Sequence, residues 1–120
     1  MPTPIRPIPP IHPLPVLTLE ETIRLHLQGI LSFSSQQPNA APLWAAIRSA
    51  ASNYLMTLFR NGTLKGDKPE MAYFARCDRG DTMTELDIEE GRAIVLVGFA
   101  PDQPAEFVII RLALQTASQP

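Results

Sequence analysis

The first apolar pattern along the chain has helical spacing and begins directly after a polar capping motif. Thr18 and Glu21 have the spacing of a capping box, in which each side chain hydrogen-bonds to the backbone N–H of the other residue. The apolar residues that follow lie four positions apart, on one face of a helix: Leu19, Ile23 and Leu27. This predicts a helix that ends at Gly29, and the segment "ILSFS", residues 30–34, predicts a short strand after it.

The strongest helical pattern runs from Leu43 to Phe59. Its apolar residues recur at three- and four-residue steps through about five turns: Leu43, Ile47, Ala50, Ala51, Tyr54, Leu55, Leu58 and Phe59. The polar segment before it predicts Asn39 as the N-cap and Pro42 in the first turn. Gly62, in "RNG", predicts a left-handed residue that closes the helix.

The second half of the chain predicts three strands and one short helix. "MAYFARCD", residues 71–78, alternates as a strand does, and the loop after it leads into a short helix that Asp81, Thr82 or Thr84 caps and Gly91 ends. Two apolar runs follow, "AIVLVGFA" at 93–100 and "EFVIIRLAL" at 106–114, and the short link "PDQP" predicts that they pair antiparallel. We therefore expect an α/β (α+β) fold with a small, mainly antiparallel sheet.

Those last two strands are apolar on both faces. Ala93, Val95, Val97 and Phe99 alternate with Ile94 and Leu96, and the final strand has apolar residues on each side as well. A sheet with one face in water alternates apolar and polar residues, so this pattern predicts cover on both faces. Two main helices and one short helix can cover one face of the sheet and part of the second. Another element, such as a second subunit, can cover the rest.

Proline changes the picture at the start of the chain. Seven of the thirteen prolines precede Val16, six of them in the segment "PIRPIPPIHPLPVL" at 4–17. A polyproline II helix turns once every three residues, which aligns an aliphatic edge of Ile5, Ile8, Ile11 and Leu14. Residues 1–17 are therefore predicted to form an extended arm, ahead of a domain at 18–116 and a flexible tail at 117–120. The arm has three interpretations: it docks on a neighbouring subunit, it is a disordered solubilising leader, or its three PxxP repeats bind an SH3-like aromatic groove.

Composition narrows the class of protein. The 120 residues carry a net charge of −2 and no concentrated basic patch, which argues against nucleic acid as a partner. No apolar stretch reaches the roughly 18 residues of a membrane span, and no signal peptide is recognisable, so we expect a soluble protein made in the cytoplasm. Cys77 is the single cysteine and has no partner for an internal disulfide.

Candidate chemistry is sparse. His12 and His26 have no carboxylate or cysteine at metal-ligand spacing, and no serine lies in a glycine elbow. Cys77 lies in an apolar strand, where a small buried residue is the usual role. The acidic group at 85–90 has the pattern of a solvated helix face, and "RGD" at 79–81 that of an exposed turn. We expect no catalytic residue, no metal, no cofactor and no enzyme activity.

Five motifs lie at the junctions of the predicted elements: Leu43-Trp44 at the start of a helix, "RNGTLKG" at its end, Cys77-Asp78 at the end of a strand, "DIEEGR" at 87–92, and "GFAPDQPAEFV" at 98–108. Together they resemble the C-terminal domain of contractile tail sheath proteins of bacteriophages and phage-tail-like particles. The resemblance covers about Leu19 to Leu112, and none of its residues is catalytic. It implies a structural subunit of a contractile tail or injection apparatus, which assembles as a ring, most simply a hexamer, around an inner tube.

Because full sheath proteins are several times longer, the resemblance implies a minimal sheath-like protein, such as an adaptor or terminator near the baseplate or cap. Its expected partners are itself and sheath, tube or baseplate proteins, in the bacterial cytoplasm during assembly and then in the virion tail or phage-tail-like particle. The predicted interface comprises Ile5, Ile8, Ile11 and Leu14 on the arm, with Phe107, Ile109 and Arg111 on the last strand. The alternative is a free-standing adaptor whose arm recruits a partner with a groove for polyproline II.

Overall fold

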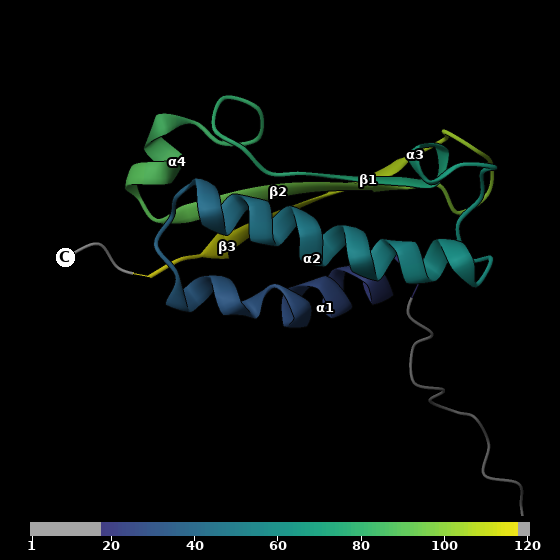
Figure 1. Ribbon diagram of the computed structural model, residues 1–120, viewed down its shortest axis with the longest axis horizontal. Helices are drawn as coiled ribbons and strands as arrows, with labels where there is room; N and C mark the ends of the chain where they lie inside the picture. Colours follow the sequence, from purple (N-terminus) through teal and green to yellow (C-terminus); the bar gives the residue numbers. More distant parts are fainter. Residues whose placement is uncertain (1–17, 118–120) are drawn as a thin grey trace, which may run out of the picture.

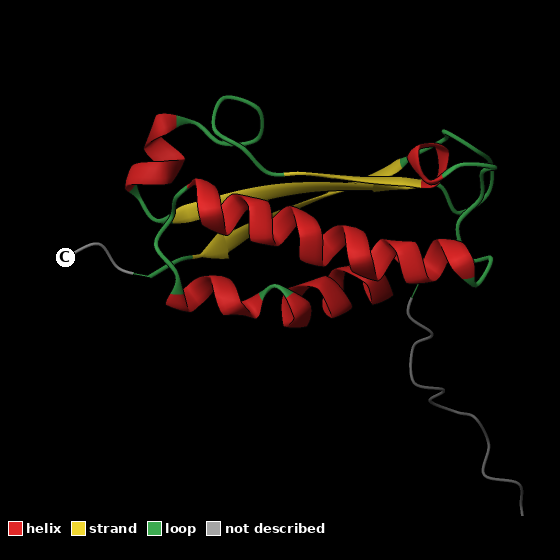
Figure 2. Cartoon of the chain, viewed as in Figure 1, coloured by secondary structure: helices red, strands yellow, loops and turns green. Residues whose placement is uncertain are grey.

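A computed structural model describes residues 18–117, so the predicted arm, with Ile5, Ile8, Ile11 and Leu14, lies outside the described residues. Figures 1 and 2 show a small α+β fold, as predicted, with the helices packed on an antiparallel sheet. Over residues 18–117 the sheet has three strands in the order β1-β2-β3. The elements are α1 (Leu19–Ile30), the 3₁₀ helix η1 (Ser32–Gln36), α2 (Ala41–Arg60), α3 (Pro69–Ala72), β1 (Tyr73–Arg76), α4 (Glu85–Glu89), β2 (Arg92–Phe99) and β3 (Val108–Gln115).

The two long helices share one face of the sheet. In Figure 1 they lie beneath the strands, where α2 packs on β1 and β2 while α1 and η1 pack on β3. Their buried apolar residues meet those of the strands in one core, whose largest fully buried side chains include Phe99, Ile23, Leu27, Leu31, Ile47, Leu55 and Ile110. Burying such side chains is the main favourable term in folding, so this layer holds the domain together.

The first helix begins as predicted and ends differently. Thr18 accepts the N–H of Glu21, whose carboxylate accepts the N–H of Thr18, so the capping box is present. The predicted strand at 30–34 is wrong, because α1 continues to Ile30 and the chain then forms η1. The reason is that Leu31 extends the four-residue spacing of the buried face, and the Ser34 hydroxyl then donates to the Gln115 carbonyl, 2.8 Å away.

The predicted N-cap of the second helix is also wrong. Ala40 is the N-cap and makes no side-chain capping bond, while Pro42 lies in the first turn as expected. Asn39 instead has a buried side chain that accepts from the Trp44 indole at 2.7 Å and donates to the Arg92 carbonyl at 3.0 Å. The amide therefore joins the start of α2 to the start of β2, which is a tertiary role that local sequence does not reveal.

The register separates the strand residues into two faces. Val97 pairs with Ala75 on one side and with Ile110 on the other, so these three share the helix-covered face. Gly98 pairs with Phe74 and Ile109, and these share the opposite face, which we call the open face. Its other members are Arg76, Arg92, Ile94, Leu96, Arg111, Ala113 and Gln115.

Candidate functional site

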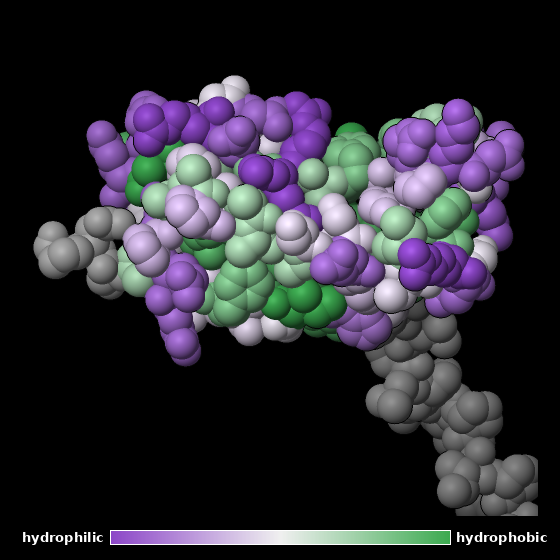
Figure 3. Space-filling view, in the orientation of Figure 1, coloured by the Kyte–Doolittle hydropathy of each residue, from purple (hydrophilic) through white to green (hydrophobic). Residues whose placement is uncertain are grey.

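Among residues 18–117, other elements cover the open face at one end and leave it uncovered toward the other. At the Arg92 end, α4 and the loop before it lie over the sheet, and Ile94 is fully buried. Beyond them Ile109 is 58% exposed, the only large apolar residue of β1–β3 that is exposed among residues 18–117. Figure 3 shows the upper outline hollowed between two hydrophilic groups, with hydrophobic residues in the hollow. Cover of this face is therefore partial, as the sequence predicted.

Two aromatic rings form the centre of the open face. Phe74 of β1 lies directly across Gly98 of β2, where a Cβ atom would fall 2.0 Å from the Phe74 ring. Phe107, just before β3, meets Phe74 edge to face, with ring centroids 5.2 Å apart and planes at 88°. Both rings are half-buried. The absence of a side chain at Gly98 lets the ring lie flat on the sheet, so the face has a shallow aromatic floor.

One of the two edges of the sheet is the outer side of β3. The Arg92 and Ile94 carbonyls of β2 point away from β3, since they accept from Asn39 and Thr82 on the β1 side. The alternate residues of β2 therefore pair with β3. On β3 this directs the backbone groups of 108, 110, 112 and 114 to β2 and those of 109, 111, 113 and 115 outward.

Side chains from the helical layer engage two of these outward carbonyls. Arg24 donates to the Arg111 carbonyl at 3.4 Å, and Ser34 donates to the Gln115 carbonyl at 2.8 Å. The N–H groups of Ile109, Arg111 and Ala113 have no acceptor among residues 18–117. An unpaired row of this kind is a template for another strand, and a charged side chain beside it is a common protection. The contact with Arg24 is long and exposed, so it is easily displaced.

The structure brings together the three predicted interface residues of the last strand. Phe107, Ile109 and Arg111 share the open face, and the outer edge of β3 runs beside them. The sequence prediction missed Phe74, which no linear motif connects to Phe107. Two signals could have identified Phe74. They are the alternation in "MAYFARCD", and the antiparallel pairing of that strand with the strand that contains Gly98.

No family model matches the chain, and no curated protein does. Three solved structures are similar over 78% of it. One is from the anti-feeding prophage baseplate, six-fold symmetrised (36% identity, TM-score 0.68), and the second from an extracellular contractile injection system, the PVC sheath complex in the contracted state (40%, TM-score 0.66). The third is from the anti-feeding prophage helical sheath in the contracted state (39%, TM-score 0.54). The chain contains a tail sheath-like domain. It spans about a quarter of the length of these chains, 26%, 27% and 25% respectively.

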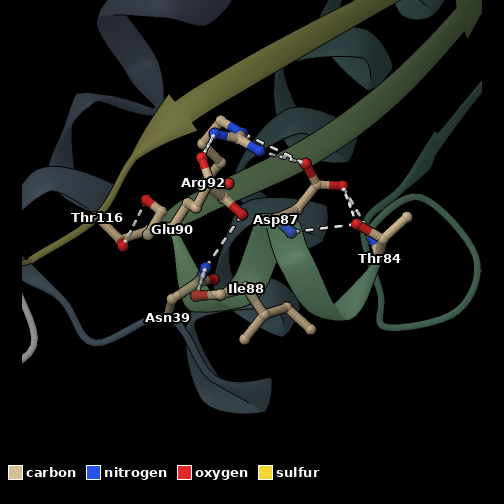
Figure 4. A network of polar contacts seen from close by, with 8 residues as sticks. Asn39, Thr84, Asp87, Ile88, Glu90, Arg92 and Thr116 are labelled. Atoms are coloured by element: carbon tan, nitrogen blue, oxygen red, sulfur yellow. Dashed lines mark hydrogen bonds and ion pairs between the residues drawn. The ribbon is translucent and has the colours of Figure 1, made fainter.

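The "DIEEGR" motif of the sheath-like domain fixes the junction of α4 and β2 (Figure 4). Asp87 closes a capping box with Thr84 and accepts two hydrogen bonds from the Arg92 guanidinium. Arg92 also pairs with Glu90 at 2.6 Å, and Gly91 takes a left-handed φ of 79° in the turn between them. The Thr84 backbone N–H and the Arg92 guanidinium hold the pKa of Asp87 below its usual value.

The other motifs of the sheath-like domain also determine backbone conformation. Gly62 in "RNGTLKG" has a φ of 87° and ends α2, as predicted, and the Lys65 N–H then donates to the Ala100 carbonyl. In "GFAPDQPAEFV", Ala105 has a positive φ of 61°, and its N–H donates to the Met71 carbonyl. These bonds place the turn before β3, and with it Phe107, next to β1.

Residues that first suggested chemistry have structural positions in the sheath-like domain. Cys77 is fully buried, and desolvation raises the pKa of its thiol to about 12, so the thiol is protonated at neutral pH. His26 is exposed on α1, with Nδ1 2.8 Å from the Tyr54 hydroxyl. Between residues 18 and 117, no three His, Cys, Asp or Glu side chains are grouped to hold a metal ion. None of the helices in that range is long and apolar enough to cross a membrane.

Proposed function

We propose that the protein is a structural subunit of a contractile tail or injection apparatus, in which it assembles as a ring around the inner tube. The observation that carries this proposal is 36–40% identity, over 78% of the chain, with structures of a sheath and a baseplate. The role is structural rather than enzymatic. The partners are further copies of the chain and sheath, tube or baseplate proteins.

The position of the ring is part of the proposal. We place the protein as an adaptor or terminator near the baseplate or cap, and the similarity to a baseplate structure supports this position. A six-fold ring follows the six-fold symmetry in the description of that baseplate. The subunit is made in the bacterial cytoplasm and functions in the tail or tail-like particle.

The interface that we assign to the ring is the outer edge of β3. The N–H groups of Ile109, Arg111 and Ala113 point outward and can pair with an extended segment of a neighbouring copy. Such a segment displaces Arg24 from the Arg111 carbonyl and gains that acceptor as well. Arg111 is exposed, and its charge at the edge discourages pairing with an unrelated strand.

Two substitutions at one position test this interface. Ala113→Pro removes an outward N–H and leaves the hydrogen bonds between β2 and β3 in place. Ala113→Val is the matched control, because valine has the same number of side-chain carbons as proline and keeps the N–H. We expect the unmodified chain and Ala113→Val to form particles of about 79 kDa (six times 13.2 kDa), measured by size-exclusion chromatography with light scattering. Ala113→Pro should remain at 13.2 kDa while the buried Trp44 keeps its native emission.

Two results would contradict the proposal. A strictly monomeric unmodified chain that also fails to bind purified sheath or baseplate would remove the ring and its position. Particles of full size from folded Ala113→Pro would remove the β3 edge as the interface.

A further inference from the structure

No element of residues 18–117 covers the centre of the open face, and the exposed residues there form one group. Phe74, Leu96 and Phe107 are half-buried, and Ile109 is 58% exposed beside them. Leu25 on α1 and Leu86 on α4 are similarly exposed, but both lie outside this group of residues on the open face. A single exposed leucine is ordinary on a protein surface, whereas a contiguous group with an aromatic floor marks a docking surface.

We propose that residues 4–14 of the chain lie across the open face of their own copy, with Ile5, Ile8 and Ile11 against Phe74, Phe107 and Ile109. Extended proline-rich segments bind in aromatic-lined grooves, because the polyproline II helix is preformed and its ordering costs little entropy. Nine of the eleven residues in this segment are proline or belong to the aliphatic edge, and proline lacks the N–H that pairing with the β3 edge requires. Side-chain contact on a face therefore suits this segment better than addition to the sheet.

The direction of α1 places the start of the described chain near the aromatic pair. Arg24 reaches the Arg111 carbonyl and Ser34 reaches the Gln115 carbonyl, so α1 and η1 run alongside β3 in the same direction. Thr18 lies about 9 Å before Arg24 along the helix, and Phe107 lies about 13 Å before Arg111 along the strand. Figure 1 shows the starts of α1 and β3 toward the same end of the molecule.

The length of the arm fits this path. Seventeen residues precede Thr18, and as polyproline II they span up to ~53 Å at ~3.1 Å per residue. With residues 4–14 on the open face, residues 15–17 connect Leu14 to Thr18 over up to ~12 Å at ~3.1 Å per residue. This length exceeds the roughly 10 Å between packed layers, which the chain must pass to reach the open face. The short tether also gives the arm a high effective concentration at this face, which favours its own copy over a neighbour.

Cross-linking in the full chain tests the proposal. Cys77, the single native cysteine, is fully buried, so Ile8→Cys can be labelled selectively with a benzophenone maleimide under native conditions. Arg6→Cys is the control, because in a three-residue rod position 6 lies on a different edge from position 8. After irradiation, mass spectrometry locates the adducts. We expect those from position 8 on the peptides that carry Phe74 and residues 107–109, with far fewer from position 6.

A mixture of ¹⁵N-labelled and unlabelled protein, unfolded and refolded together, shows whether the arm docks on its own copy or on a neighbouring copy. We expect adducts within one copy only, whether or not the protein forms rings, so failure here differs from failure of the ring. Ile109→Ser should lower the equilibrium constant for docking of the arm about tenfold, because much of one aliphatic contact is lost. Leu86→Ser, at an equally exposed leucine on α4, should leave it unchanged.

Adducts that join labelled and unlabelled copies would overturn the proposal. So would adducts spread over α1 and α2, or equal patterns from positions 6 and 8. If Ile109→Ser does not fold, as judged by Trp44 emission, the comparison of positions 6 and 8 in the otherwise unmodified chain still decides.

Discussion

Gly98→Ala is the substitution whose effect the structure defines most closely. The new Cβ would lie 2.0 Å from one carbon of the Phe74 ring and 2.5 Å and 2.6 Å from two others. Ordinary contact begins at about 3.4 Å, so the ring must move by more than about 1.4 Å. Its movement breaks the edge-to-face contact with Phe107, which is worth about 0.5–1.5 kcal/mol. It also exposes part of a half-buried ring.

We expect Gly98→Ala to lower the free energy of unfolding by about 2 kcal/mol, within the range for overpacked sites. With a denaturant slope of about 1–3 kcal/mol per M, the midpoint in urea falls by about 0.7–2 M. Trp44 reports the transition, because it is the single tryptophan and is 4% exposed. Gly29→Ala is the control: a Cβ there meets nothing within 4 Å. As a helix residue it should stabilise by roughly 0.5–1 kcal/mol.

A double-mutant cycle identifies the ring as the cause. In a Phe74→Ala background the clash is absent, so Gly98→Ala should be neutral or slightly stabilising. This gives a coupling free energy above about 1 kcal/mol. Equal loss from Gly98→Ala in both backgrounds would refute the reasoning, since the strain would then lie elsewhere than in Phe74.

Three further predictions concern single side chains. The pKa of Asp87 is lower in the folded protein than its ordinary value, so the ionised carboxylate stabilises the folded state at neutral pH. This contribution disappears as the pH falls through the folded-state pKa. Urea unfolding between pH 7 and 2 should show Asp87→Asn less stable than the unmodified chain at pH 7 and equally stable in acid. Thr18→Ala removes a capping box and should reduce stability by about 1 kcal/mol, while Thr18→Ser retains most of it. Cys77 should react with a thiol reagent only as fast as the protein unfolds; fast reaction in the native state would contradict its burial.

Sequence pattern predicted the elements whose signal is local. The spacing of Leu43, Ile47, Ala51 and Leu55 marks a buried helix face, and all four are buried on α2. The capping box at Thr18 and the left-handed Gly62 also depend only on near neighbours. The strand predicted at 30–34 failed because its short apolar run fits both periods, and contact with β3 decided between them.

The candidate site was partly predictable for the same reason. Alternation placed Phe107 and Ile109 on one side of their strand, and the structure keeps them there. The contribution of Phe74 depends on which residues β2 places opposite it, and Asn39 similarly has partners 49 and 53 positions away. Such pairings arise from register and packing, which a single strand or loop does not encode.

The course of the chain along β3 has a mechanical consequence. Thr18 lies toward the start of β3, whereas Ala117 follows its end and donates its N–H to the Gln37 carbonyl after η1. Tension between these two points acts along the strand rather than across it. It stresses the hydrogen bonds between β2 and β3 in shear, so that many must break together instead of one after another. A domain connected in this way resists extension best in the direction of β3.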